Sequence, residues 1–202
     1  MIGFNGTSRA DTSNIGTYKL LQDVNIGWLQ QVRTNAAENW LQGEETAPSS
    51  GIFELSIGDS GDDYQTLDAL VYDMVNSLIE PWYRGDPRLV VVLGRELLAD
   101  KYFPLVNDKN QKPTDTLAAD MIISQKRVGG LRAVAAPFFP AAAVLVTRLD
   151  NLSVYYQRSA QRRAVIDNPK RDRIETFQSS NDAFVIEDYG CAALAENIVI
   201  AA

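Results

Sequence analysis

The spacing of apolar residues between positions 62 and 107 predicts a helix, a buried strand and a second helix. In the first part, apolar residues recur every three or four positions, as in an amphipathic helix. They are Leu67, Leu70, Val71, Met74, Val75, Leu78, Ile79 and Trp82. Asp62 is expected to cap this helix and Pro81 to end it. The uninterrupted run Leu89–Leu93 predicts a strand buried on both faces, and residues 95–103 a second helix. These three elements form the nucleus of a layered α/β domain.

The segments on either side of this nucleus predict further elements. An apolar stripe along residues 18–41 predicts a long helix, with Gly27 costing about 1 kcal/mol relative to alanine. Four more elements are expected: a strand at 52–57, a helix at 114–127, and strands at 131–139 and 144–146.

Beyond residue 151 the apolar positions change to a period of two, which is typical of short strands. These strands are expected at 154–157, 163–166, 173–177 and 183–186. The change of pattern predicts two lobes. One is an α/β lobe at 51–149, and the other is built from both ends of the chain, 1–50 and 150–202.

The amino-acid composition excludes most of the common types of catalytic site. The 202 residues include no histidine and one cysteine, Cys191, so Ser-His-Asp and Cys-His arrangements, thiolate cages and disulfides within the chain are excluded. With 26 acidic and 19 basic residues the net charge is −7, which argues against a protein coated in nucleic acid. No apolar run is long enough to span a membrane, and the single cysteine indicates a reducing compartment.

Asp59, Asp62 and Asp63 form an acidic turn before the helix predicted from Leu67 onward. Their spacing does not match an EF-hand loop, so a solvated turn with a helix cap is favoured over a cation site. The letters of residues 58–61, Gly-Asp-Ser-Gly, resemble the surroundings of a serine nucleophile, but no imidazole is present to accept the proton.

A basic run lies between positions 158 and 173, where two aspartates, Asp167 and Asp172, accompany six cations. The cations are Arg158, Arg162, Arg163, Lys170, Arg171 and Arg173. A nucleic-acid patch is one interpretation, and a solvated strand pair or charged subunit contact is the other. The absence of helical or aromatic interleaving favours the second.

Longer stretches of sequence narrow the assignment further. They include GRELLADKYFPLVN at 94–107, ISQKR at 123–127 and DNPKRDR at 167–173. Further stretches lie at 3–10, 21–25, 27–30, 67–71, 80–84, 136–140, 147–153 and 187–194. In this order, and over nearly the whole chain, they resemble the major capsid protein of peduovirus-type tailed phages.

The resemblance implies an α+β, HK97-like capsid fold. An axial-type α/β lobe is then expected at 51–149. A peripheral lobe with a long spine helix and antiparallel strands is expected from 1–50 and 150–202, the latter returning to pack on the spine helix. Members of this family carry an N-terminal arm and an extended loop ahead of the spine helix. These two elements are expected to be missing from this chain.

The resemblance also implies a structural role: a major capsid subunit that forms pentameric and hexameric capsomers of an icosahedral phage head around double-stranded DNA. It implies no enzymatic activity, cofactor, metal or membrane. Expected partners are copies of the chain, the scaffolding and portal proteins of the phage, and packaged DNA by non-specific contact. Assembly is expected in the bacterial cytoplasm, with the product in the virion. A connector or decoration protein, and a small-molecule-binding α/β domain, are the alternatives.

Two surfaces follow from this role as hypotheses. The basic run is expected at a subunit contact, facing Asp59, Asp62 or Asp63 of a neighbouring copy, since charged pairs set the register between subunits. Reversing Arg171 and Arg173 is then expected to impair capsomer formation. The loop at 108–113, or the helix after it, is expected to line the capsomer axis.

Overall fold

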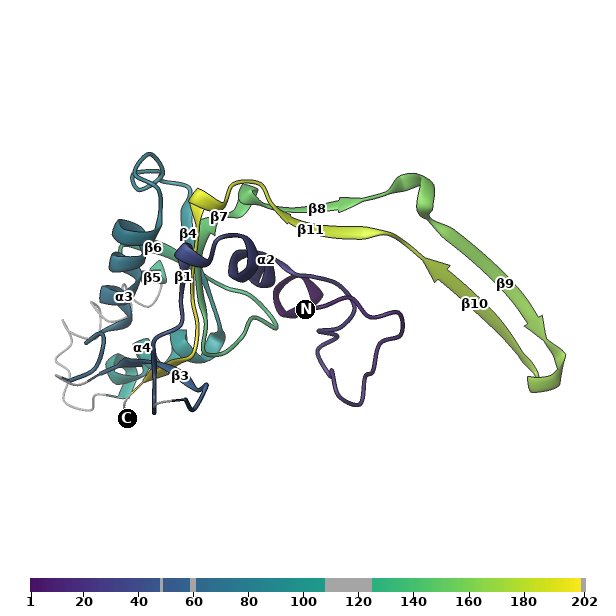
Figure 1. Ribbon diagram of the computed structural model, residues 1–202, viewed down its shortest axis with the longest axis horizontal. Helices are drawn as coiled ribbons and strands as arrows, with labels where there is room; N and C mark the ends of the chain where they lie inside the picture. Colours follow the sequence, from purple (N-terminus) through teal and green to yellow (C-terminus); the bar gives the residue numbers. More distant parts are fainter. Residues whose placement is uncertain (48, 59–60, 108–124, 201–202) are drawn as a thin grey trace.

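A six-stranded sheet forms the centre of the computed structural model, which describes residues 1–47, 49–58, 61–107 and 125–200 (Figure 1). Its strand order is β1-β12-β7-β4-β6-β5. The strands are β1 (Trp40–Leu41), β4 (Leu89–Leu93), β5 (Arg127–Val128), β6 (Leu131–Ala135), β7 (Val144–Arg148) and β12 (Ala192–Ala195). β4 runs parallel to β6 and antiparallel to β7, so the sheet is mixed.

The middle of the sheet is buried on both faces because β4 is apolar at every position and β7 is apolar at Val144, Leu145 and Val146. All five residues of β4 are buried, and their side chains alternate between two cores. Val91 and Leu93 join one core, and Val90 and Val92 join the other. The strand that the apolar run predicted is therefore confirmed with its bounds, and its two-sided burial follows from the period-two geometry of strands.

Helices cover the two faces of the sheet. On one face lie α3 (Leu67–Asp73), its continuation as the π-helical turn η2 (Met74–Leu78), and α4 (Arg95–Asn107); α2 (Trp28–Asn35) lies on the other (Figure 1). The two predicted helices around β4 are confirmed, but the cap of the first was wrong. α3 begins after Thr66, whose side chain accepts a hydrogen bond from the Ala69 N–H, so Thr66 rather than Asp62 is its N-cap.

The long helix predicted over residues 18–41 is wrong. The structure forms only the eight residues of α2 there, followed by the short 3₁₀ helix η1 (Ala37–Asn39) and β1. Turns occupy much of the preceding segment, and Leu21 has a left-handed φ of 57°. Asp23 is buried and accepts hydrogen bonds from the Ser13 hydroxyl and the Asn14 N–H. These local polar contacts compete with helix formation, and Gly27 becomes the N-cap of α2.

A second, three-stranded sheet lies beside the first near the C-terminus. It contains β2 (Glu44–Glu45), β3 (Phe53–Ile57) and β13 (Ile198–Ile200), in the order β13-β3-β2. The strand predicted at 52–57 is thereby confirmed as β3. The N-terminus forms a single helical turn, α1 (Ile2–Asn5), that packs on α2.

Residues 152–186 form a long hairpin that projects away from the sheets (Figure 1). Its inner part pairs β8 (Leu152–Tyr156) with β11 (Asp182–Ile186), and its outer part pairs β9 (Arg162–Asn168) with β10 (Arg173–Ser179). The 3₁₀ turns η3 (Leu149–Asn151), η4 (Arg158–Ala160), η5 (Pro169–Arg171) and η6 (Tyr189–Cys191) lie at its base, its middle and its tip. At about 3.3 Å per residue, β8 and β9 together span roughly 40 Å.

The strands predicted from the period-two pattern are confirmed as β8, β9, β10 and β11. The strands predicted at 131–139 and 144–146 are confirmed as β6 and β7, although β6 ends at Ala135. The helix expected at 114–127 lies almost wholly outside the described residues. The loop at 108–113, proposed for the capsomer axis, lies wholly outside them. The division into lobes at 51–149 and at 1–50 with 150–202 stays a prediction. The central sheet takes strands from all three of these segments.

Candidate assembly interface

All six cations of the basic run lie on the projecting hairpin. Arg158 is in η4, Arg162 and Arg163 are in β9, Lys170 and Arg171 are in η5, and Arg173 begins β10. Within the described ranges, Arg173 is the one member that forms an ion pair, with its Nε 2.7 Å from Glu175 Oε1. The other five charges therefore remain available on an element that extends away from the body.

The same hairpin carries apolar side chains that the sequence analysis did not single out. They are Val154, Tyr155, Tyr156, Val165, Ile166, Ile174 and Phe177, each more than half exposed. Register places Ile166 and Phe177 on one face of the outer ribbon and Val165 and Ile174 on the other, so both faces are partly apolar. A two-stranded ribbon without a packing layer is marginally stable, and exposed apolar patches typically mark interaction sites. The sequence signal that could have revealed these exposed apolar faces was the adjacent pair Val165-Ile166, because neighbouring residues of a strand point to opposite faces.

The base of the hairpin is held firmly by the segment around α2. The indole N–H of Trp28 donates to the carbonyls of Ser153 and Val185, both at 3.1 Å, one on each strand of the inner ribbon. The Gln31 amide donates to the Phe184 carbonyl at 2.6 Å. The Trp28 and Phe184 rings pack edge to face with centroids 5.1 Å apart. The inner ribbon is thereby fixed in direction while the outer ribbon extends beyond it.

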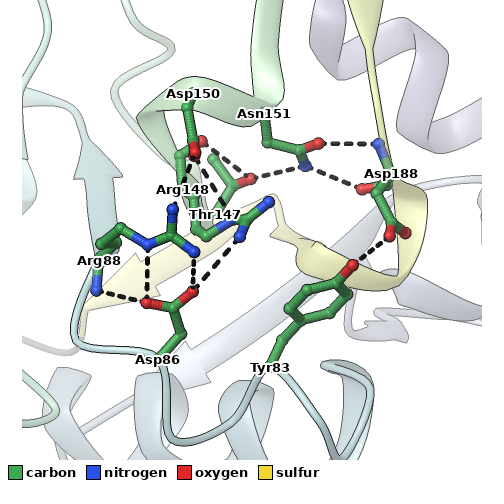
Figure 2. A network of polar contacts seen from close by, with 8 residues as sticks. All are labelled: Tyr83, Asp86, Arg88, Thr147, Arg148, Asp150, Asn151 and Asp188. Carbon is green, nitrogen blue, oxygen red and sulfur yellow. Dashed lines mark hydrogen bonds and ion pairs between the residues drawn. The ribbon is translucent and has the colours of Figure 1, made fainter.

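A polar network joins the two strands where the hairpin leaves the sheet (Figure 2). Asn151 is 1% exposed and lies at the start of the outgoing strand. Its amide donates to Thr147 Oγ1 at 3.1 Å and to the Asp188 carbonyl at 2.8 Å, and its oxygen accepts from the Asp188 N–H at 2.8 Å. The Tyr83 hydroxyl donates to the Asp188 carboxylate, and this bond raises the pKa of Tyr83. Three separate segments are therefore locked together at one point.

The network continues into an ion-pair cluster (Figure 2). The Asp86 carboxylate accepts from Arg88 Nη2 at 2.8 Å and lies 3.4 Å from Arg148 Nη1. Hydrogen bonds from Arg88 hold the pKa of Asp86 well below its ordinary value, because they stabilise the charged carboxylate. The Arg148 guanidinium also lies over the Tyr83 ring, 5.2 Å from its centroid. Asp86 therefore stays ionised across the physiological range.

The acidic turn lies in the body and not beside the basic run. Asp63 accepts from the N–H of Ser56 in β3 at 2.9 Å, so it bridges the two sides of its own turn. Asp62 is half-buried, and Asp59 lies outside the described residues. Within one chain, the ion pairs of the described residues include none between this turn and the hairpin, so the predicted pairing stays a proposal about two copies.

The described residues do not assemble a catalytic or metal centre. Cys191 is fully buried, and burial raises the pKa of its thiol, which disfavours the reactive thiolate. Among these residues, no group of three or more acidic, cysteine or histidine side chains could hold a metal ion. A search of the same residues found no helix long and apolar enough to cross a membrane.

Comparison with known proteins gives a consistent assignment. The profile of the family described as "Phage major capsid protein, P2 family" matches residues 1–198. The "Capsid proteins" of Escherichia phage P2 are 50% identical over 203 residues, 99% of this chain and 56% of theirs. The "Major capsid protein" of Serratia phage KSP20 is 40% identical over 211 residues, 100% of this chain and 58% of its own length. The chain thus spans a little over half the length of these relatives.

Comparison with solved structures leads to the same family. A chain of the "Satellite phage P4 procapsid including size determination (Sid) protein" superposes with a TM-score of 0.87 at 46% sequence identity, covering 100% of this chain and 59% of that one. This match confirms the α+β class and agrees with the HK97-like capsid fold that the resemblance implied. By profile, sequence and structure together, the chain belongs to the P2 family of phage major capsid proteins.

Proposed function

We propose that this chain is the assembling part of a phage capsid subunit, which associates with copies of itself into pentameric and hexameric capsomers of the head. The observation that carries the proposal is the hairpin of residues 152–186. Its outer strands are exposed at nearly every position and carry apolar side chains, and five cations that form no ion pair among the described residues lie on β9 and on the turns η4 and η5. A two-stranded ribbon without a packing layer is marginally stable and exposed apolar side chains mark interaction sites, so we expect the outer ribbon to lie against another subunit.

The hairpin is suited to a contact between copies for two reasons. Its inner ribbon is fixed by Trp28 and by the Asn151 network, so the tip is presented in a defined direction with little loss of entropy on binding. Its cations concentrate positive charge on a chain whose net charge is −7, so the acidic groups of a neighbouring copy can attract them locally although the two copies carry the same net charge. The acidic turn with Asp62 and Asp63 is the proposed partner surface, together with Asp59.

The wider setting follows from the same role. The subunit is placed in the virion capsid and assembles in the bacterial cytoplasm, with the scaffolding and portal proteins of its phage as further partners. Packaged double-stranded DNA is contacted without sequence preference, as suits a wall that encloses it. A shell subunit needs no cofactor, which is consistent with the family's structural role.

Charge reversal at the hairpin tip tests the proposal. Lys170→Glu/Arg171→Glu is expected to weaken self-association at least tenfold, because it turns attraction into repulsion at the contact. The matched control, Lys19→Glu/Arg84→Glu, makes the same change in net charge on exposed residues of the body. The measurement is sedimentation velocity over a range of concentrations, with circular dichroism to verify folding. Equal self-association of both variants and the unmodified chain would contradict the role given to the hairpin.

A further inference from the structure

Two surfaces of opposite charge lie at opposite ends of strand β4. The first is a pocket of about 580 Å³ at its beginning, whose charged lining residues are Arg88, Arg127, Arg132 and Asp150. The second is a groove beyond its end, whose charged lining residues are Glu96 and Asp100 of α4. With three arginines against one aspartate the pocket is basic, and with two carboxylates and no cation the groove is acidic. We call them the basic pocket and the acidic groove.

The basic pocket contains an unusual cross-strand pair. Arg127 and Arg132 are direct partners in the antiparallel β5–β6 ladder, and both are exposed. Like charges placed directly opposite destabilise a sheet, and in the described part of the chain neither guanidinium has an acidic partner. Arg88 differs, because Asp86 and Asp150 hold it (Figure 2). An anionic group from outside would relieve the repulsion between the two free arginines.

The acidic groove shows the complementary arrangement. Glu96 and Asp100 stand four residues apart on α4, both are exposed, and the ion pairs of the described residues do not involve either of them. Side chains four apart on a helix have Cβ atoms about 5–6 Å apart, and directly opposed residues of an antiparallel pair about 4.5–5.5 Å apart. Two carboxylates can therefore face two guanidinium groups in register.

Apolar residues surround both charged pairs. Leu131 and Leu149 line the basic pocket, and Ala141, Ala142 and Ile200 line the acidic groove. Leu149 is 54% exposed, so the pocket presents apolar surface that a partner could cover. Protein contacts combine apolar surface with a polar rim, whereas contacts with the nucleic-acid backbone are much more positively charged, so the mixed lining of both surfaces favours a protein partner.

We infer that the basic pocket of one copy receives the acidic groove of the next, with Arg127 and Arg132 paired to Glu96 and Asp100. Because the two surfaces lie at opposite ends of β4, the contact is heterologous, and repetition of it generates a ring or an open chain of copies. The inference deepens the proposed capsomer role and rests on it. It assigns the contact within a ring to the ends of the central sheet, separately from the hairpin.

Exchange of the charges tests this pairing. The first variant carries Arg127→Glu and Arg132→Glu, and the second carries Glu96→Arg and Asp100→Arg. Each alone is expected to weaken self-association at least tenfold by sedimentation velocity. An equimolar mixture should restore association, because each contact between the two variants again joins opposite charges. The restored rings should contain even numbers of alternating copies, which native mass spectrometry can count.

A control variant distinguishes loss of this contact from a general effect of net charge. Lys19→Glu/Arg84→Glu changes the net charge of the chain as the first variant does, on exposed residues outside both surfaces and outside the hairpin, and should associate normally. Unchanged association of both variants would overturn the pairing and leave the capsid role standing, as would loss of association that the mixture does not restore. If the first variant associates normally but no longer binds a 20-base-pair DNA duplex, the pocket is a nucleic-acid surface and the inference is wrong. An unmodified chain that never associates would overturn both the pairing and the capsomer role.

Discussion

Replacing Asn151 by alanine should loosen the base of the hairpin by a predictable amount. The substitution removes three hydrogen bonds in a site that is 1% exposed: two from the amide and one to its oxygen. At about 1 kcal/mol net for each hydrogen bond, the free energy of unfolding should fall by about 3 kcal/mol. For a chain of this size, about 2–4 °C of Tm is lost per kcal/mol, which gives a drop of roughly 6–12 °C.

The assay is urea denaturation followed by tryptophan fluorescence, together with hydrogen exchange of the inner ribbon. Asn151→Asp serves as an isosteric comparison, because it keeps the acceptor for the Asp188 N–H but loses both donors. It should therefore also destabilise, which separates lost hydrogen bonds from lost volume. Asn76→Ala is the matched control, since Asn76 makes one exposed bond to the Tyr72 carbonyl, and should change stability by less than about 0.5 kcal/mol.

The result for Asn151→Ala that would refute this reasoning is a loss below about 1 kcal/mol, equal to that of Asn76→Ala. Faster exchange confined to β8 and β11 would instead support the view that the network holds the hairpin to the sheet. The expected consequence for function is weaker self-association of the Asn151 variant, since a mobile hairpin loses more entropy on binding.

Two further predictions concern the body of the protein. Burial and the hydrogen bond to Asp73 raise the pKa of Tyr64 from 10.0 to about 12, so its stabilising effect is complete below pH 10 and is lost as the pH rises through 12. Denaturation curves should therefore lose stability over that interval in the unmodified chain but less so in Tyr64→Phe; identical pH profiles would contradict the assignment. Gly129→Ala should destabilise by more than about 1 kcal/mol, because φ is +57° and a Cβ would lie 2.6 Å from Val71 Cγ1. In thermal melts Gly130→Ala, at φ +79° but in open space, should cost less, and equal losses would show that the contact does not matter.

The sequence was most informative where burial alone decides the structure. The run Leu89–Leu93 became the central strand because apolar side chains at every position require cover on both faces. The cations from Arg158 to Arg173 were recognised as a group, and the structure places all six on one element. Their contact with a second copy remains a prediction, because it depends on the partner.

The sequence was least informative where local polar contacts override the apolar pattern. Residues 18–41 show helical spacing, yet the buried carboxylate of Asp23 and the left-handed backbone at Leu21 favour turns before α2. The basic pocket could not be found from spacing either. Arg127 and Arg132 become neighbours only through the register of β5 and β6, and the hydrogen bonds from Trp28 to both strands of the inner ribbon join positions far apart in the sequence.

The native mass of the unmodified chain, measured over a wide range of concentrations with the same samples imaged by negative-stain electron microscopy, tests the central claim most directly. The capsomer account predicts closed rings of five or six copies that form as concentration rises and dissociate in high salt, since charged contacts set their register. A folded chain that remains monomeric at every concentration would contradict it.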